Sequence, residues 1–306
     1  MKQFIFIIGL FACMISYSQS LNGFDLQGSL IPAKEILRGG PPRDGIPSID
    51  KPLFTAANES SFTDQSQVLG VVYNGIAKAY PIDILNWHEI VNDVFVDESI
   101  SITYCPLCGS GMAYVGKVNG KKTTFGVSGL LYNSDVLLYD RSTNSLWSQV
   151  LNKAVTGEMK GQKLTRIATQ RTSLRAWKEL YPETLVLSRE TGFSRDYQRT
   201  PYAGYDKSSQ LYFPIKDKSD ILHEKEWVLG LEVNGKYKAY PISKLADREE
   251  KTLIDEIGGE KVTLSWDANA ENIEIKNSQG QGIVGIQLFW FAWYAFHSDS
   301  EVWNLY

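Results

Sequence analysis

A segment of fifteen residues occurs twice in this sequence, and it restricts the folds open to the chain more than any other feature. Residues 68–82 read VLGVVYNGIAKAYPI, and residues 228–242 read VLGLEVNGKYKAYPI. In both copies Asn-Gly separates two β-forming runs, which is the strongest short hairpin signal because both turn residues need a positive φ. A Pro-Ile pair then favours a helix start. We therefore predict a mainly β (α+β) fold with a few short helices, built as two related β-rich lobes from an internal duplication.

The boundaries of the two lobes follow from the repeat and from the amino terminus. Residues 1–20 combine an early lysine, an apolar run and small polar residues, which is the pattern of a cleaved signal peptide. Lobe one then spans 21–215 and lobe two spans 216–306. We expect a periplasmic or secreted protein with no transmembrane segment in the mature chain. A lipoprotein anchored through Cys13 is the less favoured alternative.

Charge and cysteine content exclude several classes of protein. The 306 residues include 31 Lys and Arg against 35 Asp and Glu, so the net charge of −4 argues against a nucleic-acid partner. Three Cys and three His are too few for a disulfide scaffold or a cluster of many metal ligands. Cys13 leaves with the predicted signal peptide, so the mature chain keeps Cys105 and Cys108.

The spacing of Cys105 and Cys108 admits three interpretations: a redox dithiol, two ligands of one metal, or a local disulfide. The sequence Cys-Pro-Leu-Cys is similar to the motif of thiol oxidoreductases, in which a helix start lowers the pKa of the first thiol. Here Gly-Ser-Gly follows Cys108 and argues against such a helix. A glycine-rich turn that presents two sulfurs to a metal is the favoured interpretation. Lobe two lacks the pair, because a constant offset of 160 places Ser265 opposite Cys105 and Arg248 opposite His88.

Few side chains are available to complete a metal site. His88 belongs to a short helix predicted to start near Pro81, and it shares an inward face with Ile84 and Leu85, so it is either a ligand or a core residue. The aromatic run 289–297 alternates as a strand would, which makes His297 either the end of a core strand or a ligand reaching across the lobes.

Two further residues complete the search for ligands. Met112 offers a thioether that would suit copper, although it also fits a strand core. His223 lies in a charged stretch and is expected at the surface. A second convincing helix is predicted over 173–180, with Thr172 as its N-cap. The loop 39–47 is expected to be extended, with Arg43 and Asp44 lining a cleft or facing water.

The order and spacing of several motifs resemble one family of exported bacterial proteins, DUF3179, whose function is unknown. The segments that carry the resemblance are 39–47, 87–93, 104–109, 125–129, 140–141 with 145–147, 201–202 and 291–297. The resemblance covers nearly all of the mature chain. It implies a shared fold and a shared site, and it implies no activity.

Taken together, these patterns predict an exported metal-binding protein. One copper or zinc site would be formed by Cys105, Cys108 and His88, with Met112 or His297 as a fourth ligand, and copper is preferred. Its role would be metal handling or metal-dependent redox chemistry. Two alternatives stay open: a periplasmic thiol–disulfide redox protein that uses Cys105 as nucleophile, and a non-catalytic module that binds a glycan or a protein. The sequence does not decide between catalysis and binding, and its partner is an unidentified small molecule or protein.

Overall fold

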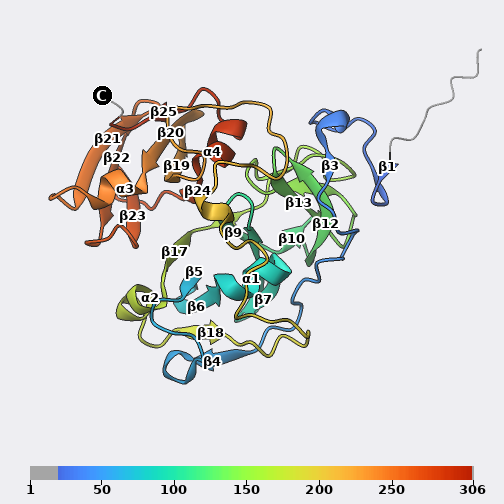
Figure 1. The fold of residues 1–306 in the computed structure, drawn as a ribbon, viewed down its shortest axis with the longest axis horizontal. Helices are drawn as coiled ribbons and strands as arrows, with labels where there is room; N and C mark the ends of the chain where they lie inside the picture. The colour runs from blue at the N-terminus through green and yellow to red at the C-terminus, as the bar shows by residue number, and fades with distance from the viewer. Residues whose placement is uncertain (1–19, 305–306) are drawn as a thin grey trace, which may run out of the picture.

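The computed structural model describes residues 20–304, and within them the chain is mainly β with a few short helices, as predicted. Five small sheets of three or more strands stand in the arrangement of a five-bladed propeller (Figure 1). The predicted signal peptide, apart from Ser20, lies outside the described residues, and so does Cys13. Within residues 20–304, no helix has both the length and the apolar character that crossing a bilayer requires.

Two of the sheets contain the repeated hairpins. The β5 sheet has the strand order β17 (Thr169–Ser173), β5 (Gln67–Tyr73), β6 (Ile76–Pro81), β18 (Leu185–Leu187) and β4 (Phe54–Ala56). The β19 sheet has the order β24 (Ile286–Phe289), β19 (Trp227–Val233), β20 (Lys236–Pro241) and β25 (Glu301–Val302). In both sheets an antiparallel strand flanks the hairpin on one side and a parallel strand flanks it on the other.

Two other sheets continue directly from these hairpins. Helix α1 (Ile82–His88) leads into the β8 sheet, ordered β16 (Arg166–Ile167), β9 (Ser110–Val115), β8 (Glu98–Cys105) and β7 (Ile90–Phe95). Helix α3 (Ile242–Ala246) leads into the β22 sheet, formed by β21 (Thr252–Ile257), β22 (Glu260–Trp266) and β23 (Ile273–Asn277). Ile90 pairs with Thr103, and Thr252 pairs with Ser265. The residues of these two sheets therefore correspond at an offset two residues larger than the offset of 160 between the repeated segments.

Most of the fifth sheet is inserted in the chain between β9 and β16, two strands of the β8 sheet. The β12 sheet is ordered β15 (Lys153–Ala154), β14 (Leu146–Ser148), β13 (Asp135–Asp140), β12 (Phe125–Tyr132) and β3 (Leu37–Arg38). Two small hairpins accompany it: β1 (Ser20–Leu21) with β2 (Phe24–Asp25), and β10 (Lys117–Val118) with β11 (Lys121–Lys122). The second hairpin turns at Asn119-Gly120, where both residues have a positive φ.

The predicted architecture of two related lobes is wrong, because the sheets form a five-bladed arrangement. One hydrophobic core contains Cys105 and Cys108 together with Val228, Phe289 and Trp290, so residues from both predicted lobes share it. Phe289 N also donates a hydrogen bond of 2.8 Å to Cys108 O. The repeat therefore produces matching sheets without producing separate lobes, because the apolar faces of these sheets are buried against one another.

The short helices test the local predictions. The helix predicted over 173–180 is confirmed as α2 (Leu174–Leu180), although Ser173 is its N-cap, because Ser173 Oγ accepts a hydrogen bond from Ala176 N at 3.2 Å. The strand predicted over 289–297 is wrong, because most of this run forms helix α4 (Trp290–Phe296). The run is apolar on nearly every side and is buried on nearly every side, so its sequence carries no periodicity that separates helix from strand.

Candidate metal centre

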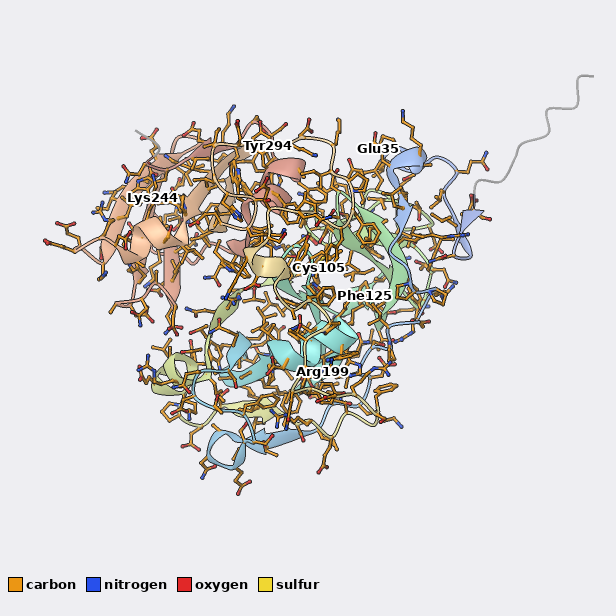
Figure 2. The ribbon with its side chains drawn as sticks, viewed as in Figure 1. Glu35, Cys105, Phe125, Arg199, Lys244 and Tyr294 are labelled. Atoms are coloured by element: carbon orange, nitrogen blue, oxygen red, sulfur yellow. The ribbon has the colours of Figure 1, made fainter. Side chains whose placement is uncertain are left out.

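Cys105 and Cys108 lie in a tight turn that joins the last residue of β8 to the first residue of β9. Cys108 N donates to Cys105 O at 3.2 Å and closes the turn. Gly109 follows with φ of 66°, and a Cβ atom at this position would come within 2.6 Å of the Trp227 ring. Glycine is therefore required both by the backbone conformation and by the close approach of Trp227. Both cysteines are unpaired and almost fully buried, and Figure 2 shows Cys105 near the middle of the molecule.

Asp135, the first residue of β13, is the third member of this centre. The two sulfurs and a carboxylate oxygen of Asp135 all lie within 4.8 Å of one another. Asp135 is 1% exposed, and its Oδ2 accepts a hydrogen bond from Val150 N at 3.1 Å. Its Oδ1 is buried without a hydrogen-bond partner among the described residues. A buried carboxylate oxygen without a donor is costly.

The carbonyl of Ser134 completes the surroundings of the two sulfurs. It accepts from Cys105 Sγ at 3.7 Å and from Cys108 Sγ at 3.4 Å. Asn133 and Ser134 both have a positive φ, and this turn directs the start of β13 toward the cysteines. Sequence reasoning missed Asp135 because no signal in the sequence shows that β13 passes beside the turn 105–108.

Burial disfavours negative charge throughout the centre. It raises the pKa of Cys105 and raises that of Cys108 well above its ordinary value. It also raises the pKa of Asp135 to about 7, and burial together with the charge of Asp135 raises the pKa of Glu89 to about 8. Neutral protonated side chains are therefore favoured unless a cation joins them. A nucleophilic thiolate requires the opposite environment, with a lowered pKa and access to a partner.

The long segment between β18 and β19, residues 188–226, covers the candidate centre. Tyr205 and Phe213 of this segment pack against the same hydrophobic core as the cysteines. Ser134 Oγ donates to Phe213 O at 2.8 Å, which ties the segment to the start of β13. Lys225 is 4% exposed and donates from Nζ to two carbonyls of the segment, those of Ser208 and Gln210, at 3.0 and 3.1 Å. The cover is thus held by partly buried hydrogen bonds as well as by apolar contact.

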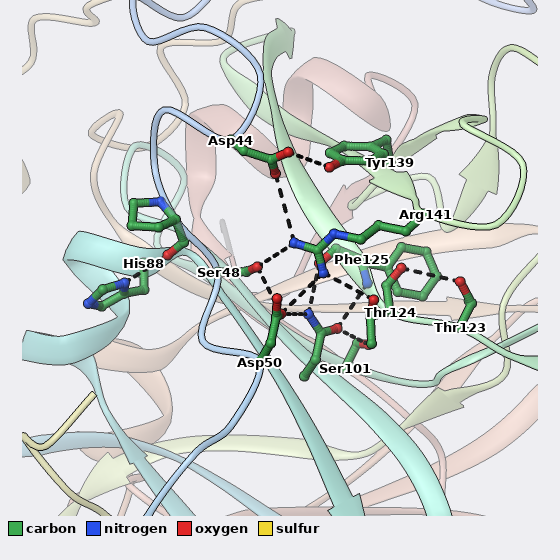
Figure 3. Close-up of polar contacts among 12 residues, drawn as sticks. Asp44, Ser48, Asp50, His88, Ser101, Thr123, Thr124, Phe125, Tyr139 and Arg141 are labelled. Atoms are coloured by element: carbon green, nitrogen blue, oxygen red, sulfur yellow. Dashed lines mark hydrogen bonds and ion pairs between the residues drawn. The ribbon is translucent and has the colours of Figure 1, made fainter. Parts of the chain in front are cut away.

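The structure does not bring His88 to the cysteines. His88 ends α1 and is fully buried, with Nδ1 2.7 Å from Pro47 O (Figure 3) and Nε2 2.7 Å from Tyr197 Oη. Both ring nitrogens thus have partners elsewhere. Glu89 follows with φ of 56° and ends the helix, after which the chain enters β7. Among the described residues, the cluster formed by Cys105, Cys108 and Asp135 contains no histidine.

His297 and His223 also lie apart from this group. His297 follows α4, stacks on Tyr237 with ring centroids 4.0 Å apart, and has an Nδ1 without a partner among residues 20–304. Burial lowers the pKa of His297 to about 4. His223 is exposed, as predicted. Met112 lies on β9 in the same core as the cysteines, and its Sδ accepts from Tyr114 Oη at 2.8 Å.

The loop that contains Arg43 and Asp44 belongs to a surface network rather than to the metal centre. Asp44 accepts a hydrogen bond of 2.5 Å from Tyr139 Oη and lies 3.9 Å from Arg141 (Figure 3). Arg141 in turn donates to Asp50 at 3.1 Å. Because these contacts join the opening loop to the β12 sheet, their evident role is to fasten that loop.

Comparisons with known proteins give one match. A family model described as "Protein of unknown function (DUF3179)" covers residues 43–284 of the 306-residue chain. No match was found among the curated proteins, and none was found among the solved structures. The family match includes β4 through β23 and therefore the whole candidate centre. Because this match covers most of the sequence, the chain belongs to the DUF3179 family.

Proposed function

We propose that this chain is an exported metal-binding protein whose metal is held by Cys105, Cys108 and Asp135. The observation that carries the proposal is the buried approach of two thiols to a carboxylate oxygen that has no hydrogen-bond partner in the described part of the chain. A metal cation would bind all three groups in their anionic forms and remove the cost of burying them. Asp135 thus takes the place that the sequence analysis assigns to His88.

Catalytic zinc sites commonly have three protein ligands, whereas structural zinc sites have four, so these three residues would suit a catalytic ion. The donor set favours zinc, because zinc accepts thiolate and carboxylate ligands together, whereas copper(I) prefers soft sulfur donors. When bound, such an ion supplies a Lewis acid at the end of β8. The covering segment would keep water away from it, and the buried carboxyl of Glu89, with its pKa of about 8, would hold a proton at neutral pH.

A thiol–disulfide redox role is the second candidate, and the short distance between the two sulfurs favours it. The raised pKa of both thiols and the covering segment weigh against it, because the attacking thiolate would be scarce and shielded. The same protein preparation can be used to test both candidate functions, metal binding and thiol–disulfide exchange.

The test is elemental analysis of protein purified without chelators and under anaerobic conditions. We expect about one metal ion per chain in the wild type and in His88→Gln, and loss of that metal in Asp135→Asn and in Cys105→Ser/Cys108→Ser. His88→Gln is the matched control, because it alters the residue that the sequence favours as a ligand. Circular dichroism shows whether each variant is folded, and Asp135→Asn keeps the size of the side chain.

The proposal would be overturned by folded wild-type protein that neither carries metal nor takes up added zinc or copper. Loss of metal in His88→Gln with retention in Asp135→Asn would refute the ligand set. A Cys105–Cys108 disulfide that forms and is reduced reversibly in metal-free protein would favour the redox candidate instead.

A further inference from the structure

The strand β21 forms one edge of the β22 sheet, near the left margin of the molecule (Figure 1). Its inner edge pairs with β22 over residues 252–257, and Trp266 N donates to Lys251 O at 3.0 Å. Because the direction of the backbone groups alternates along a strand, this bond fixes which N–H and C=O groups point outward. They are those of Thr252, Ile254 and Glu256. Among residues 20–304, no strand or isolated bridge pairs with this outer edge.

The corresponding edge in the first copy of the repeat is occupied. There the edge strand is β7, and Ile49 forms a parallel bridge with it. Ile49 N donates to Ile90 O at 2.9 Å, and Ile49 O accepts from Asn92 N at 2.8 Å. The matching pairing of the two sheets places Thr252 and Ile254 of β21 where β7 has Ile90 and Asn92. The backbone groups that hold Ile49 on β7 are therefore open on β21 in the described part of the chain.

The side chains at this edge differ in the same way. Asn92 is 5% exposed, and its Nδ2 donates to Asp50 Oδ1 at 2.7 Å and to Phe125 O at 2.8 Å. It thus binds both the covering segment and the β12 sheet. Ile254, in the corresponding position, is 59% exposed. An unpaired edge strand with an exposed apolar side chain is a template for another strand, and most native proteins block such an edge.

The outer edge of β21 is complementary to itself. When two copies are paired antiparallel about a two-fold axis at Ile254, the two Ile254 residues lie opposite each other and exchange two backbone hydrogen bonds. Thr252 of each copy then lies opposite Glu256 of the other. Glu256 N already donates to Asp255 Oδ1 at 2.8 Å, so each of these pairs adds one bond, from Thr252 N to Glu256 O. In this register the apolar side chains cover each other, and no like charges lie directly opposite.

We propose that a second copy of this chain pairs with the outer edge of β21. The two three-stranded β22 sheets would then form one continuous sheet across a two-fold axis. The contact is limited to one strand from each copy, so it suits a dimer that dissociates on dilution. The metal centre proposed above uses none of these residues, and the inference goes beyond the function proposed for that centre.

The first test is analytical ultracentrifugation of the purified protein at concentrations from about 1 μM to about 1 mM. We expect the wild type to change from monomer to dimer across this range, and Ile254→Lys to stay monomeric, because a lysine on an edge strand opposes pairing. Val94→Lys is the matched control and should dimerise as the wild type does. Val94 lies on the edge strand β7 and is 55% exposed, close to the 59% of Ile254.

The second test examines the register of the two strands. Under mild oxidation, Ile254→Cys should form a disulfide-linked dimer, because the Cα atoms of a hydrogen-bonded antiparallel pair are about 5.5 Å apart, within the range of disulfides. Thr252→Cys should not, because the two copies of residue 252 would be displaced by four residues, or about 13 Å, along the strands. Addition of EDTA should leave dimerisation unchanged, so failure of the metal proposal would not imitate failure here.

The inference is overturned if folded wild-type protein stays monomeric over the whole range, or if Ile254→Lys dimerises as the wild type does. Loss of the dimer in Val94→Lys but not in Ile254→Lys would place the contact elsewhere and overturn it as well. Faster cross-linking of Thr252→Cys than of Ile254→Cys would refute the two-fold register. Binding of a synthetic peptide with the sequence of residues 46–51 to monomeric protein would replace the second copy with a parallel strand of the Ile49 kind.

Discussion

A buried ion pair and its more exposed counterpart allow a matched test of the packing in the two repeated sheets. Lys78 Nζ lies 2.7 Å from Asp93 Oδ2, with the two side chains 8% and 6% exposed. Tyr80 Oη donates to the same oxygen at 2.6 Å. In the second copy, Lys238 Nζ lies 2.8 Å from Asp255 Oδ2, and the side chains are 13% and 18% exposed.

We predict that Lys78→Met destabilises the protein more than Lys238→Met does. Removing Lys78 leaves the Asp93 carboxylate buried without a cation, which costs about 3–5 kcal/mol. The same change at Lys238 leaves a carboxylate that water reaches, and it should cost about 1–2 kcal/mol, between the values for exposed and buried pairs. For a chain of this size, the first variant should melt about 7 °C below the wild type and the second about 3 °C below it.

The assay is thermal and urea unfolding of both variants, followed by circular dichroism at one pH and one salt concentration. Because the two substitutions are chemically identical, differences in side-chain size and helix or strand propensity cancel. Equal destabilisation by both variants, or a larger effect of Lys238→Met, would refute the argument that burial sets the cost.

Three further predictions concern single positions. Because burial lowers the pKa of His297 from 6.5 to about 4, the unfolded chain binds a proton that the folded chain does not, so stability falls by up to ~3 kcal/mol as the pH drops from about 6.5 to about 4. His297→Phe should lose less stability than the wild type between pH 7 and pH 4.5, as measured by urea unfolding at both pH values. An equal loss of unfolding free energy in the two proteins would contradict this account. Gly109→Ala, with φ of 66° and a new Cβ 2.6 Å from Trp227, should cost about 2 kcal/mol or more and weaken metal binding. Gly230→Ala places a Cβ 2.3 Å from the Trp293 ring and should cost about 1–3 kcal/mol while leaving metal content unchanged, which thermal unfolding and elemental analysis check together.

Local signals in the sequence predict most of the hairpins and three of the four α-helices in the described residues. Asn-Gly turns at Asn74 and Asn234 appear where expected, because these turns need residues that accept a positive φ. The strand predicted through Trp293 fails for a physical reason. The residues form a helix that is buried on nearly all sides, so nearly all of them are apolar. Such a helix lacks the polar face that would give the sequence a helical period.

The candidate site is predictable from the sequence only in part, because the approach of Asp135 depends on contacts between distant segments. Cys105 and Cys108 are identified by their spacing, which is local. Asp135 comes to them through the insertion of the β12 sheet, and no pattern along the chain reports that approach. His88 was favoured because its helix leads toward β8, but the left-handed residue Glu89 reverses the chain and leaves the imidazole with Pro47 and Tyr197.

The turns 105–110 and 267–272 occupy corresponding places in two matching sheets. Each is closed by a hydrogen bond between residues three apart, but the left-handed residue is Gly109 in the first turn and Ala270 in the second. In the second turn, the Asp267 carboxylate also accepts hydrogen bonds from the backbone N–H groups of residues 269 and 271. The repeat therefore fixes where the turn falls without fixing its conformation, so a thiol pair transplanted to residues 267 and 270 would have to bring its own backbone with it.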